Sequence, residues 1–506
     1  MILRYTGHPL LDVGIAGLVA FAGRQRPEEL TEADLEAAAD YMAANYTVQP
    51  LRSYLSNVFM NADGFTQAAY SKDTEKQLRY ADLVLRSFRI DTPTLDEIDP
   101  FLGLPVADIS FNVKDELPSG RTDRRHIPLQ TGVGIINFHP EGSPGLPVSG
   151  ATLLGFQALP LGSAKCEGKL LAVHSDNPDL MLDFAASFLQ TNRTYLHIAH
   201  QTGSTKLGES SFKQGTLLVK TLLEARDMQL TAQTNQLPFT ITAYHLGSGQ
   251  KPYLNIYHLP SQVILYLKKM LRADYAPSWN KLVYAAWDRA KLKASNDTTD
   301  EPKCNRLYED LFGLAHDPVR AASRFIRTYF LRRPLIYKGQ DNTDPRAAYS
   351  TRTEANLVSW HLTAPFLRSI LNMQEERIKQ IQSLGDSLAG YIFEENERTF
   401  YREFYSTMRF DHLRVIMLRA DRKQTAEGRP PLFTLYQFLT VFEQEGRYSS
   451  DYWRLARDLV FIRMIERLYE MEWIQQQGDP ADGSNVDDEP DGSLDWESST
   501  YSEENQ

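Results

Sequence analysis

The chain contains little cysteine and no long apolar run. Cys166 and Cys304 are the two cysteines among 506 residues, which is too few for a disulfide framework and indicates a reducing, cytoplasmic environment. Nowhere do about 18 uncharged apolar residues follow one another, so the sequence argues against a membrane span. The N-terminal stretch sets Arg4 and Asp12 around a short apolar segment and lacks the pattern of a signal peptide.

Motifs for nucleotide chemistry are also missing. No GxxxxGK[ST] pattern occurs, which argues against a P-loop NTPase or helicase engine. The stretch TGVGIINFHPEGSPGLPVSG (131–150) opens with Gly132 and Gly134, but Asn137 occupies the third glycine position of a dinucleotide fingerprint. The strand-then-helix context is absent as well, so we interpret this stretch as a structural connector.

Two histidine-containing groups have the composition of a site but not its arrangement. His174-Ser-Asp176 are adjacent, whereas a hydrolase triad converges from separate elements. A turn in which Ser175 or Asn177 caps the next helix is the better interpretation. His197 and His200 are spaced i, i+3 on a predicted helix, without an acidic residue to complete a zinc motif.

Hydroxyl side chains stand where a zinc ribbon would carry cysteines. Ser149 and Thr152 form one pair and Ser163 and Cys166 the other, so one thiolate is available and hydroxyls are poor zinc ligands. The sequence therefore predicts no metal site, no cofactor and no catalytic residues, and the chain is expected not to be an enzyme.

The net charge of −11 is concentrated at the C-terminal end. Residues 478–506 contain ten acidic residues and no Lys or Arg, and without them the chain has a net charge of −1. A Gly/Ser/Asp/Glu-rich tail has little to bury and is predicted to be disordered. The acidic composition therefore does not argue against nucleic-acid binding by local basic patches.

Helical periodicity dominates the pattern, and the predicted fold is mostly α, with a smaller mixed α/β N-terminal body and a C-terminal helical bundle. Helices are predicted over 31–46, 74–89, 178–199 and 211–226, and strands over 168–174, 239–245 and 253–258. The predicted domains are the α/β body (1–260), a basic helical segment (261–345), the bundle (353–476) and the acidic tail (477–506). Residues 340–345 are the predicted linker before the bundle.

The densest positive charge lies at 319–339, VRAASRFIRTYFLRRPLIYKG, which has six cations and no acid. Arg320, Arg324 and Arg327 fall at i, i+4 and i+7, so one helix face is predicted to be a basic stripe, which Arg332 and Arg333 extend. A solvated face with carboxylate partners elsewhere is the alternative.

Two loops and one aromatic-rich segment add further candidates for DNA contact. SGRTDRRHIP places Arg121, Arg124 and Arg125 around one acid, and TGSTKLGESSFKQG (202–215) places Thr205, Lys206, Lys213 and Gln214 among hydroxyls and glycines. Small residues let a backbone approach DNA closely, although plain surface loops are the alternative. In 266–293, Lys and Arg alternate with Tyr and Trp, where helix core is favoured over base stacking.

The stretches RYTGHPLLDVG (4–14) and GVGIINFHPEGSPGLPVSGATLLGFQALPLGSAKCEGKLLAVHSDN (132–177) resemble the large subunit of type I-B CRISPR effector complexes (Cascade). The resemblance covers most of residues 1–260, and the helical C-terminus fits the layout of the family. Some relatives carry cysteine knuckles where this chain has Ser149, Thr152 and Ser163.

The resemblance implies a non-enzymatic subunit of an RNA-guided DNA-binding complex. The α/β body would lie beside the subunit that caps the 5′ end of the guide, read the protospacer-adjacent motif in duplex DNA and help to open the strands. The bundle would line the path of the displaced strand and, in related systems, is also made separately as a small subunit, for which Met373 is a candidate start.

The implied partners are guide RNA, target duplex DNA, and the backbone, guide-capping and small helical subunits, with no membrane. Such complexes recruit a helicase-nuclease in antiviral defence or transposition proteins in RNA-guided transposition, and these residues do not separate the two. Two alternatives stay open. The chain is mainly a scaffold that contacts guide RNA and neighbouring subunits, or it is an unrecognised hydrolase that uses His174, Ser175 or His197.

Overall fold

The computed structural model divides the chain into two compact units, Met1–Arg272 (unit 1) and Ala273–Gln506 (unit 2). It describes residues 3–59, 65–66, 73–111, 117–132, 142, 144–231, 239–248, 252–289, 302–314, 318–351, 353–443 and 450–477. The boundary lies beyond the predicted end of the α/β body at 260. The predicted linker 340–345 lies within unit 2, and the predicted tail from 478 onward and most of the glycine-rich stretch 131–150 lie outside the described residues.

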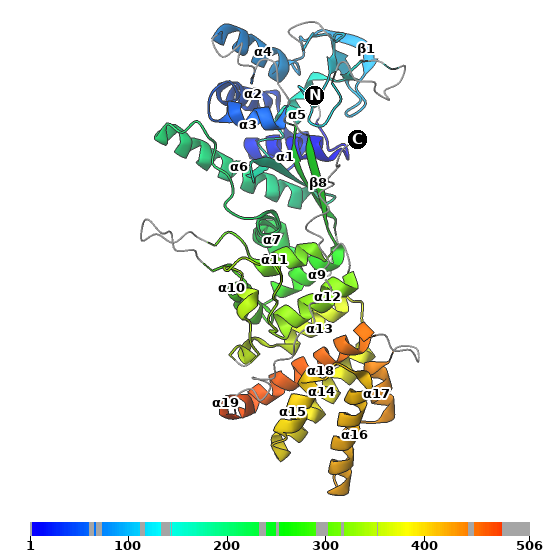
Figure 1. The fold of residues 1–506 in the computed structure, drawn as a ribbon. Helices are drawn as coiled ribbons and strands as arrows, with labels where there is room; N and C mark the ends of the chain where they lie inside the picture. Colours follow the sequence, from blue (N-terminus) through cyan, green and yellow to red (C-terminus); the bar gives the residue numbers. More distant parts are fainter. Residues whose placement is uncertain are drawn as a thin grey trace, which may run out of the picture. The chain divides into compact units, whose positions relative to one another are not determined.

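Unit 1 combines helices with a small sheet, whose edge strand β8 (Tyr253–Leu259) is largely exposed (Figure 1). Its α-helices are α1 (Pro9–Ala22), α2 (Glu32–Tyr46), α3 (Leu51–Val58), α4 (Thr74–Arg86), α5 (Gly150–Gln157), α6 (Pro178–Thr202), α7 (Gln214–Glu224), α8 (Arg226–Thr231) and α9 (Ser261–Met270). A 3-10 helix spans Pro27–Glu29. A capping box opens α2, as the Thr31 side chain and the Asp34 side chain bond reciprocally to backbone N–H groups.

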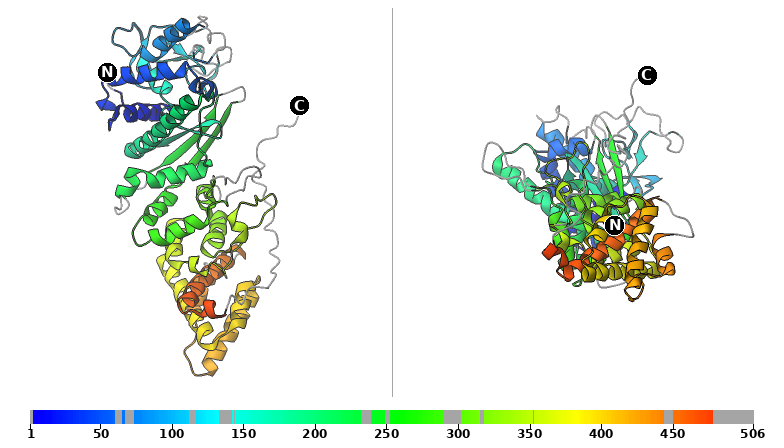
Figure 2. Two further views of the ribbon diagram at one scale, coloured as in Figure 1. Left: turned by 90° about the vertical axis from the view of Figure 1, so that its left-hand side faces the viewer. Right: turned by 60° about the horizontal axis from the view of Figure 1, so that its bottom comes forward.

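The main sheet of unit 1 has the strand order β5-β6-β7-β8, and all neighbours are antiparallel. The strands are β5 (Ala164–Cys166), β6 (Lys169–Ser175), β7 (Ile241–Gly247) and β8 (Tyr253–Leu259). The last three confirm the predicted strands. Figure 2 shows this sheet with α6 beside it. Two short hairpins complete the strands: β1 (Thr94–Ile98) with β2 (Pro105–Ala107), and β3 (Arg121–Thr122) with β4 (Leu146–Pro147).

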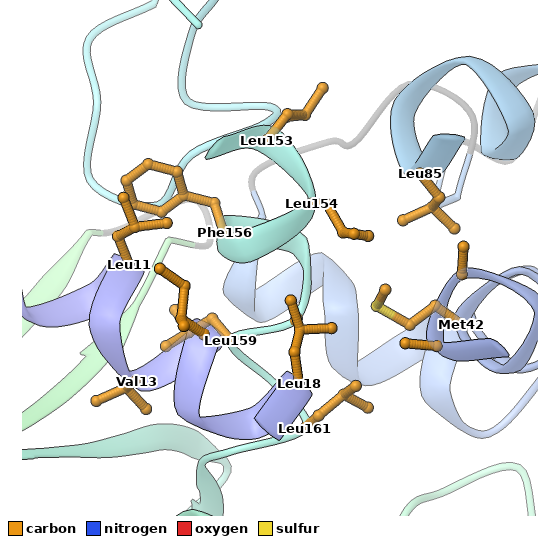
Figure 3. Close-up of a cluster of buried hydrophobic side chains, with 14 of the residues drawn as sticks. Leu11, Val13, Leu18, Met42, Leu85, Leu153, Leu154, Phe156, Leu159 and Leu161 are labelled. Atoms are coloured by element: carbon orange, nitrogen blue, oxygen red, sulfur yellow. The ribbon is translucent and has the colours of Figure 1, made fainter. Parts of the chain in front are cut away.

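The core of unit 1 forms where α1 packs on α5, with α2 and α4 alongside (Figure 3). Leu11, Leu18 and Met42 are buried here together with Leu154 and Phe156. The helices approach closely because glycines face each other: a Cβ on Gly14 would lie 1.9 Å from the carbonyl oxygen of Gly155. The small residues of the stretch VGIAG (13–17) in α1 therefore serve helix packing.

The described residues of unit 2 form helices joined by irregular segments, which include the stretch 331–344. Its α-helices are α10 (Ala276–Ala285), α11 (Arg306–Gly313), α12 (Pro318–Phe325), α13 (Trp360–Ser369), α14 (Glu375–Glu395), α15 (Arg398–Ser406), α16 (Phe410–Ala426), α17 (Leu435–Phe442), α18 (Ser450–Glu470) and α19 (Trp473–Gln477). A π-helix (Ile326–Phe330) follows α12, and 3-10 helices span Pro345–Ala348 and Ala355–Leu357.

The long helices α14 and α18 pack against each other at the centre of the C-terminal bundle (Figure 1). Stacked rings join the bundle to the basic segment: Phe325 lies parallel to Phe366 at 5.0 Å, and Phe330 meets the same ring edge-on at 5.3 Å. The basic segment around Phe325 and Phe330 thus shares a core with the bundle. The predicted fold class, mostly α with a small α/β part and C-terminal helices, is confirmed.

Candidate nucleic-acid interface

The loop between α6 and α7 carries two exposed lysines that the sequence predicts to contact DNA. We call residues 203–213 the lysine loop. Helix α6 ends at Gly203, whose φ of +66° is the left-handed conformation that glycine favours. Thr205, Lys206 and Lys213 are exposed, and both lysines lack an ion-pair partner among the described residues. The structure therefore leaves both ammonium groups available.

The lysine loop is fastened to the β5–β6 hairpin at several points. The Ser210 N–H donates to the Lys165 carbonyl at 2.9 Å, and Lys165 Nζ donates to the Leu207 carbonyl at 2.7 Å. The Glu209 carboxylate accepts the Gly168 N–H at 2.6 Å. These contacts hold the loop backbone while its lysine side chains remain in solvent.

Gln214, predicted to contact DNA, uses both polar ends of its amide inside the protein. Its Nε2 lies 2.6 Å from Glu167 Oε2 and 3.1 Å from His245 Nδ1, and its Oε1 accepts from the Tyr257 hydroxyl at 2.8 Å. The amide is half-buried. The structure thus directs Gln214 towards the sheet and not towards solvent.

The predicted loop arginines of 121–125 are mostly engaged by acids. Arg121 lies 2.9 Å from Glu97, and Arg125 bonds to Asp123 at 3.0 Å through both carboxylate oxygens. Arg124 is half-buried and has no ion-pair partner among the described residues. Of these three, Arg124 alone keeps an unpaired guanidinium within the described part of the chain.

The predicted basic stripe is partly formed on α12. Arg320 and Arg324 are exposed, and Arg324 has no ion-pair partner among the residues described. Arg327 is 41% exposed but lies 3.3 Å from Asp458, a carboxylate of α18 that is buried. Arg320 and Arg324 therefore face solvent, whereas Arg327 contacts a carboxylate of the bundle.

Arg332 and Arg333 do not extend the stripe, because both side chains turn into the protein. Arg332 is 0% exposed, bonds to Glu354 through two nitrogens at 2.7 and 3.1 Å, and lies 3.3 Å from the ring centre of Tyr349. Arg333 is buried over the ring of Tyr405 at 4.1 Å, and burial lowers the pKa of its guanidinium. Neither presents donors to a phosphate here, which corrects the prediction for both.

Asp458 ties the basic segment to the bundle. Arg457 bonds to it at 2.7 Å, and Arg327 and Arg333 lie close enough to influence it. Burial works against its charge, yet the three arginines outweigh burial and hold the pKa of this carboxyl below its ordinary value. Part of the positive charge of the segment therefore serves packing inside unit 2.

The candidate triad at 174–176 does not converge. His174 Nε2 lies 3.6 Å from the buried Asp12, the Ser175 hydroxyl donates to the Thr240 carbonyl, and Asp176 accepts the Thr240 N–H. Asn177 caps α6 by accepting the N–H groups of its first turn. The capping interpretation is confirmed, and no nucleophile–base pair forms among these residues.

The histidine pair on α6 has a polar neighbour in place of a metal ligand set. His197 lies on the exposed part of the helix, 2.9 Å from the amide nitrogen of Gln201. In the described part of the chain, no three His, Cys, Asp or Glu side chains gather as a metal site would require.

The hydroxyls in the cysteine-knuckle positions serve a buried carboxylate. Asp99, 0% exposed, accepts the Ser149 hydroxyl at 2.5 Å and the Thr152 hydroxyl, and Ser149 also caps α5. Ser163 and Cys166 are buried as well, but no hydrogen bond joins them to Asp99 among the described contacts. Hydrogen bonds thus hold the segment that cysteines and a metal would hold in a zinc ribbon. Asp99 itself was missed from the sequence, because it lies 50 residues before Ser149.

The aromatic residues of 266–293 are divided between core and surface. Tyr266 and Trp279 are buried, as favoured from the sequence, whereas Tyr284 on α10 is 84% exposed. Lys281, one turn before it, is exposed as well. The described part of the segment therefore supplies both core and surface.

No family model, curated protein or solved structure matches the chain. The candidate interface consists of Lys206 and Lys213 on the lysine loop of unit 1, which have no ion-pair partner among the described residues, and of the exposed arginines on α12 in unit 2. Every helix within the described ranges is too short or too polar to span a bilayer.

Proposed function

We propose that the chain is a non-enzymatic DNA-binding subunit of an RNA-guided complex, with the role of the type I-B large subunit that its N-terminal stretches resemble. It recognises the protospacer-adjacent motif in duplex DNA through the lysine loop and helps to open the strands. Its partners are guide RNA, target DNA and neighbouring protein subunits in the cytoplasm, in antiviral defence or RNA-guided transposition.

The observation that carries the proposal is the lysine loop. Its backbone is bonded to the β5–β6 hairpin, while Lys206 and Lys213 extend into solvent without carboxylate partners among the described residues. Free ammonium groups on an ordered backbone suit contacts to phosphates and base edges. Arg320 and Arg324 on α12 supply a second, phosphate-directed surface.

The test is the double variant Lys206→Ala/Lys213→Ala in the full chain, titrated against a labelled duplex at several salt concentrations. If both lysines contact phosphates, affinity falls and the slope of log affinity against log salt becomes shallower by about 2. The control is Lys379→Ala on α14, an exposed lysine without an ion pair among the described residues. Equal affinities and slopes for the double variant and the unaltered chain would refute the proposal.

A scaffold role is the second candidate. It is favoured by the arginines that form ion pairs within the chain. Arg121, Arg125 and Arg332 are paired with carboxylates of the same chain, so they add nothing to a DNA-binding surface. A scaffold would join its complex normally when both lysines are removed and would leave motif selection by that complex unchanged.

A further inference from the structure

We propose that Gln214 is a positioning residue, which fixes the lysine loop for sequence readout without touching DNA itself. The inference rests on the proposed function and concerns how that site reaches its selectivity. Gln214 is the first residue of α7, directly after Lys213. Its amide is held from three sides, by Glu167 in the β5–β6 turn, by His245 on β7 and by Tyr257 on β8.

The contact with His245 fixes the protonation of that ring. An amide nitrogen only donates, so Nδ1 of His245 accepts from Gln214, and its Nε2 carries the proton and donates to the Cys166 carbonyl at 3.0 Å. His245 is 0% exposed, and burial lowers the pKa of its imidazole. A neutral ring with one defined tautomer thus links Gln214 to β5.

Strand β5 also contacts the lysine loop. Cys166 Sγ lies 3.6 Å from the Phe212 carbonyl, and Phe212 precedes Lys213. The contacts therefore run from Gln214 through His245 and Cys166 to Phe212. The two ends of this series, Phe212 and Gln214, are the neighbours of Lys213 in the chain. Lys213 has a fixed neighbour on each side, while its own side chain makes no capping bond.

This arrangement separates affinity from selectivity. Lysine contacts to phosphates depend mainly on charge and tolerate displacement of the loop, whereas contacts to base edges depend on position. A loop held before binding also loses less conformational freedom when DNA arrives. Removing the amide of Gln214 should therefore reduce discrimination between sequences more than it reduces the number of phosphate contacts.

The experiment compares Gln214→Leu with the unaltered full chain on a library of labelled duplexes that differ in one short randomised motif. The expected ratio between the best and the median duplex falls about tenfold, with the salt slope unchanged. Glu167→Gln keeps an oxygen acceptor for the amide and is expected to retain selectivity. Gln380→Leu is the matched control, because it removes a Gln–Glu contact of 2.7 Å on α14.

The outcomes separate this inference from the proposed function. If the double lysine variant weakens binding but Gln214→Leu keeps the selectivity, the positioning role is refuted and the DNA-binding proposal stands. If the lysine variant has no effect, the proposed function is refuted, and the positioning role that rests on it is refuted as well. Equal binding of all duplexes by the unaltered chain would also overturn the inference. Should Gln214→Leu not fold, Tyr257→Phe replaces it with the same expected loss, because it removes the hydroxyl that donates to Gln214 and accepts from Asn255.

Discussion

At the scale of single residues, the partner of an arginine decides what its charge does. Arg324 and Arg332 belong to the same basic run, yet Arg324 is exposed and Arg332 is fully buried against Glu354 and Tyr349. Arg332 also has a φ of +57°, in the left-handed region that residues other than glycine rarely adopt. In this conformation the Arg332 guanidinium lies between the Glu354 carboxylate and the Tyr349 ring.

Replacing these two arginines should therefore have opposite consequences. Arg332→Ala leaves the Glu354 carboxylate without its partner in a half-buried site and is expected to lower the free energy of unfolding of unit 2 by about 3–5 kcal/mol. Arg324→Ala should change it by less than about 0.5 kcal/mol but weaken duplex binding. Urea unfolding followed by helix content measures both. A stable Arg332→Ala protein that binds DNA poorly would contradict the assignment.

At the scale of elements, close packing of helices in unit 1 depends on glycine at a few positions. Gly14 on α1 faces the backbone of Gly155 on α5, so the two helices meet nearly backbone to backbone. Gly390, by contrast, lies within α14 with nothing within 4 Å of the position of a Cβ. The two glycines share a helical setting and differ in the space around them.

Gly14→Ala should destabilise unit 1 by at least about 1–3 kcal/mol, because the new methyl group collides with a backbone carbonyl that cannot rotate away. Gly390→Ala should stabilise unit 2 by about 0.4–1 kcal/mol, because alanine restricts the unfolded chain and fits the helix. Thermal unfolding of the two variants against the unaltered chain checks both. Equal melting temperatures for the two alanine variants would show that the close approach of α1 and α5 is unimportant.

The sequence predicted elements better than it predicted side-chain directions. Capping at Asn177 and the patterns of β6 to β8 are local signals, and the structure bears them out. The basic stripe follows helical spacing only as far as α12. The π-helix Ile326–Phe330 then changes the spacing of side chains around the axis.

Long-range partners explain the remaining differences in the candidate site. Glu354 lies 22 residues from Arg332 and Glu167 lies 47 from Gln214, so no local pattern announces either contact. The lysine loop was identifiable, because composition marks exposed cations among glycines and hydroxyls. Which of its residues turn inward depends on the sheet, which the sequence alone does not place.

At the scale of the whole molecule, the two units divide the proposed DNA contacts between them. The lysine loop belongs to unit 1, and the exposed arginines of α12 belong to unit 2. Each unit has its own buried core, around α1 and α5 in the first and around α14 and α18 in the second. Cores of this kind support independent folding, and the boundary at residue 272 is where the chain would be divided.

The fragment 1–272 is therefore expected to fold alone, with one cooperative unfolding transition. It should retain the preference for a duplex motif, because Lys206, Lys213 and the Gln214 contacts all lie within it. Its salt slope should be shallower than that of the full chain by about 2, since Arg320 and Arg324 are absent. Anisotropy titrations of fragment and full chain, with the full-length Arg320→Ala/Arg324→Ala variant as control, measure this. Motif preference lost from a folded fragment would show that the selective contacts do not reside in unit 1. A salt slope that differs between the fragment and the arginine variant would show that residues of unit 2 other than Arg320 and Arg324 contact phosphates.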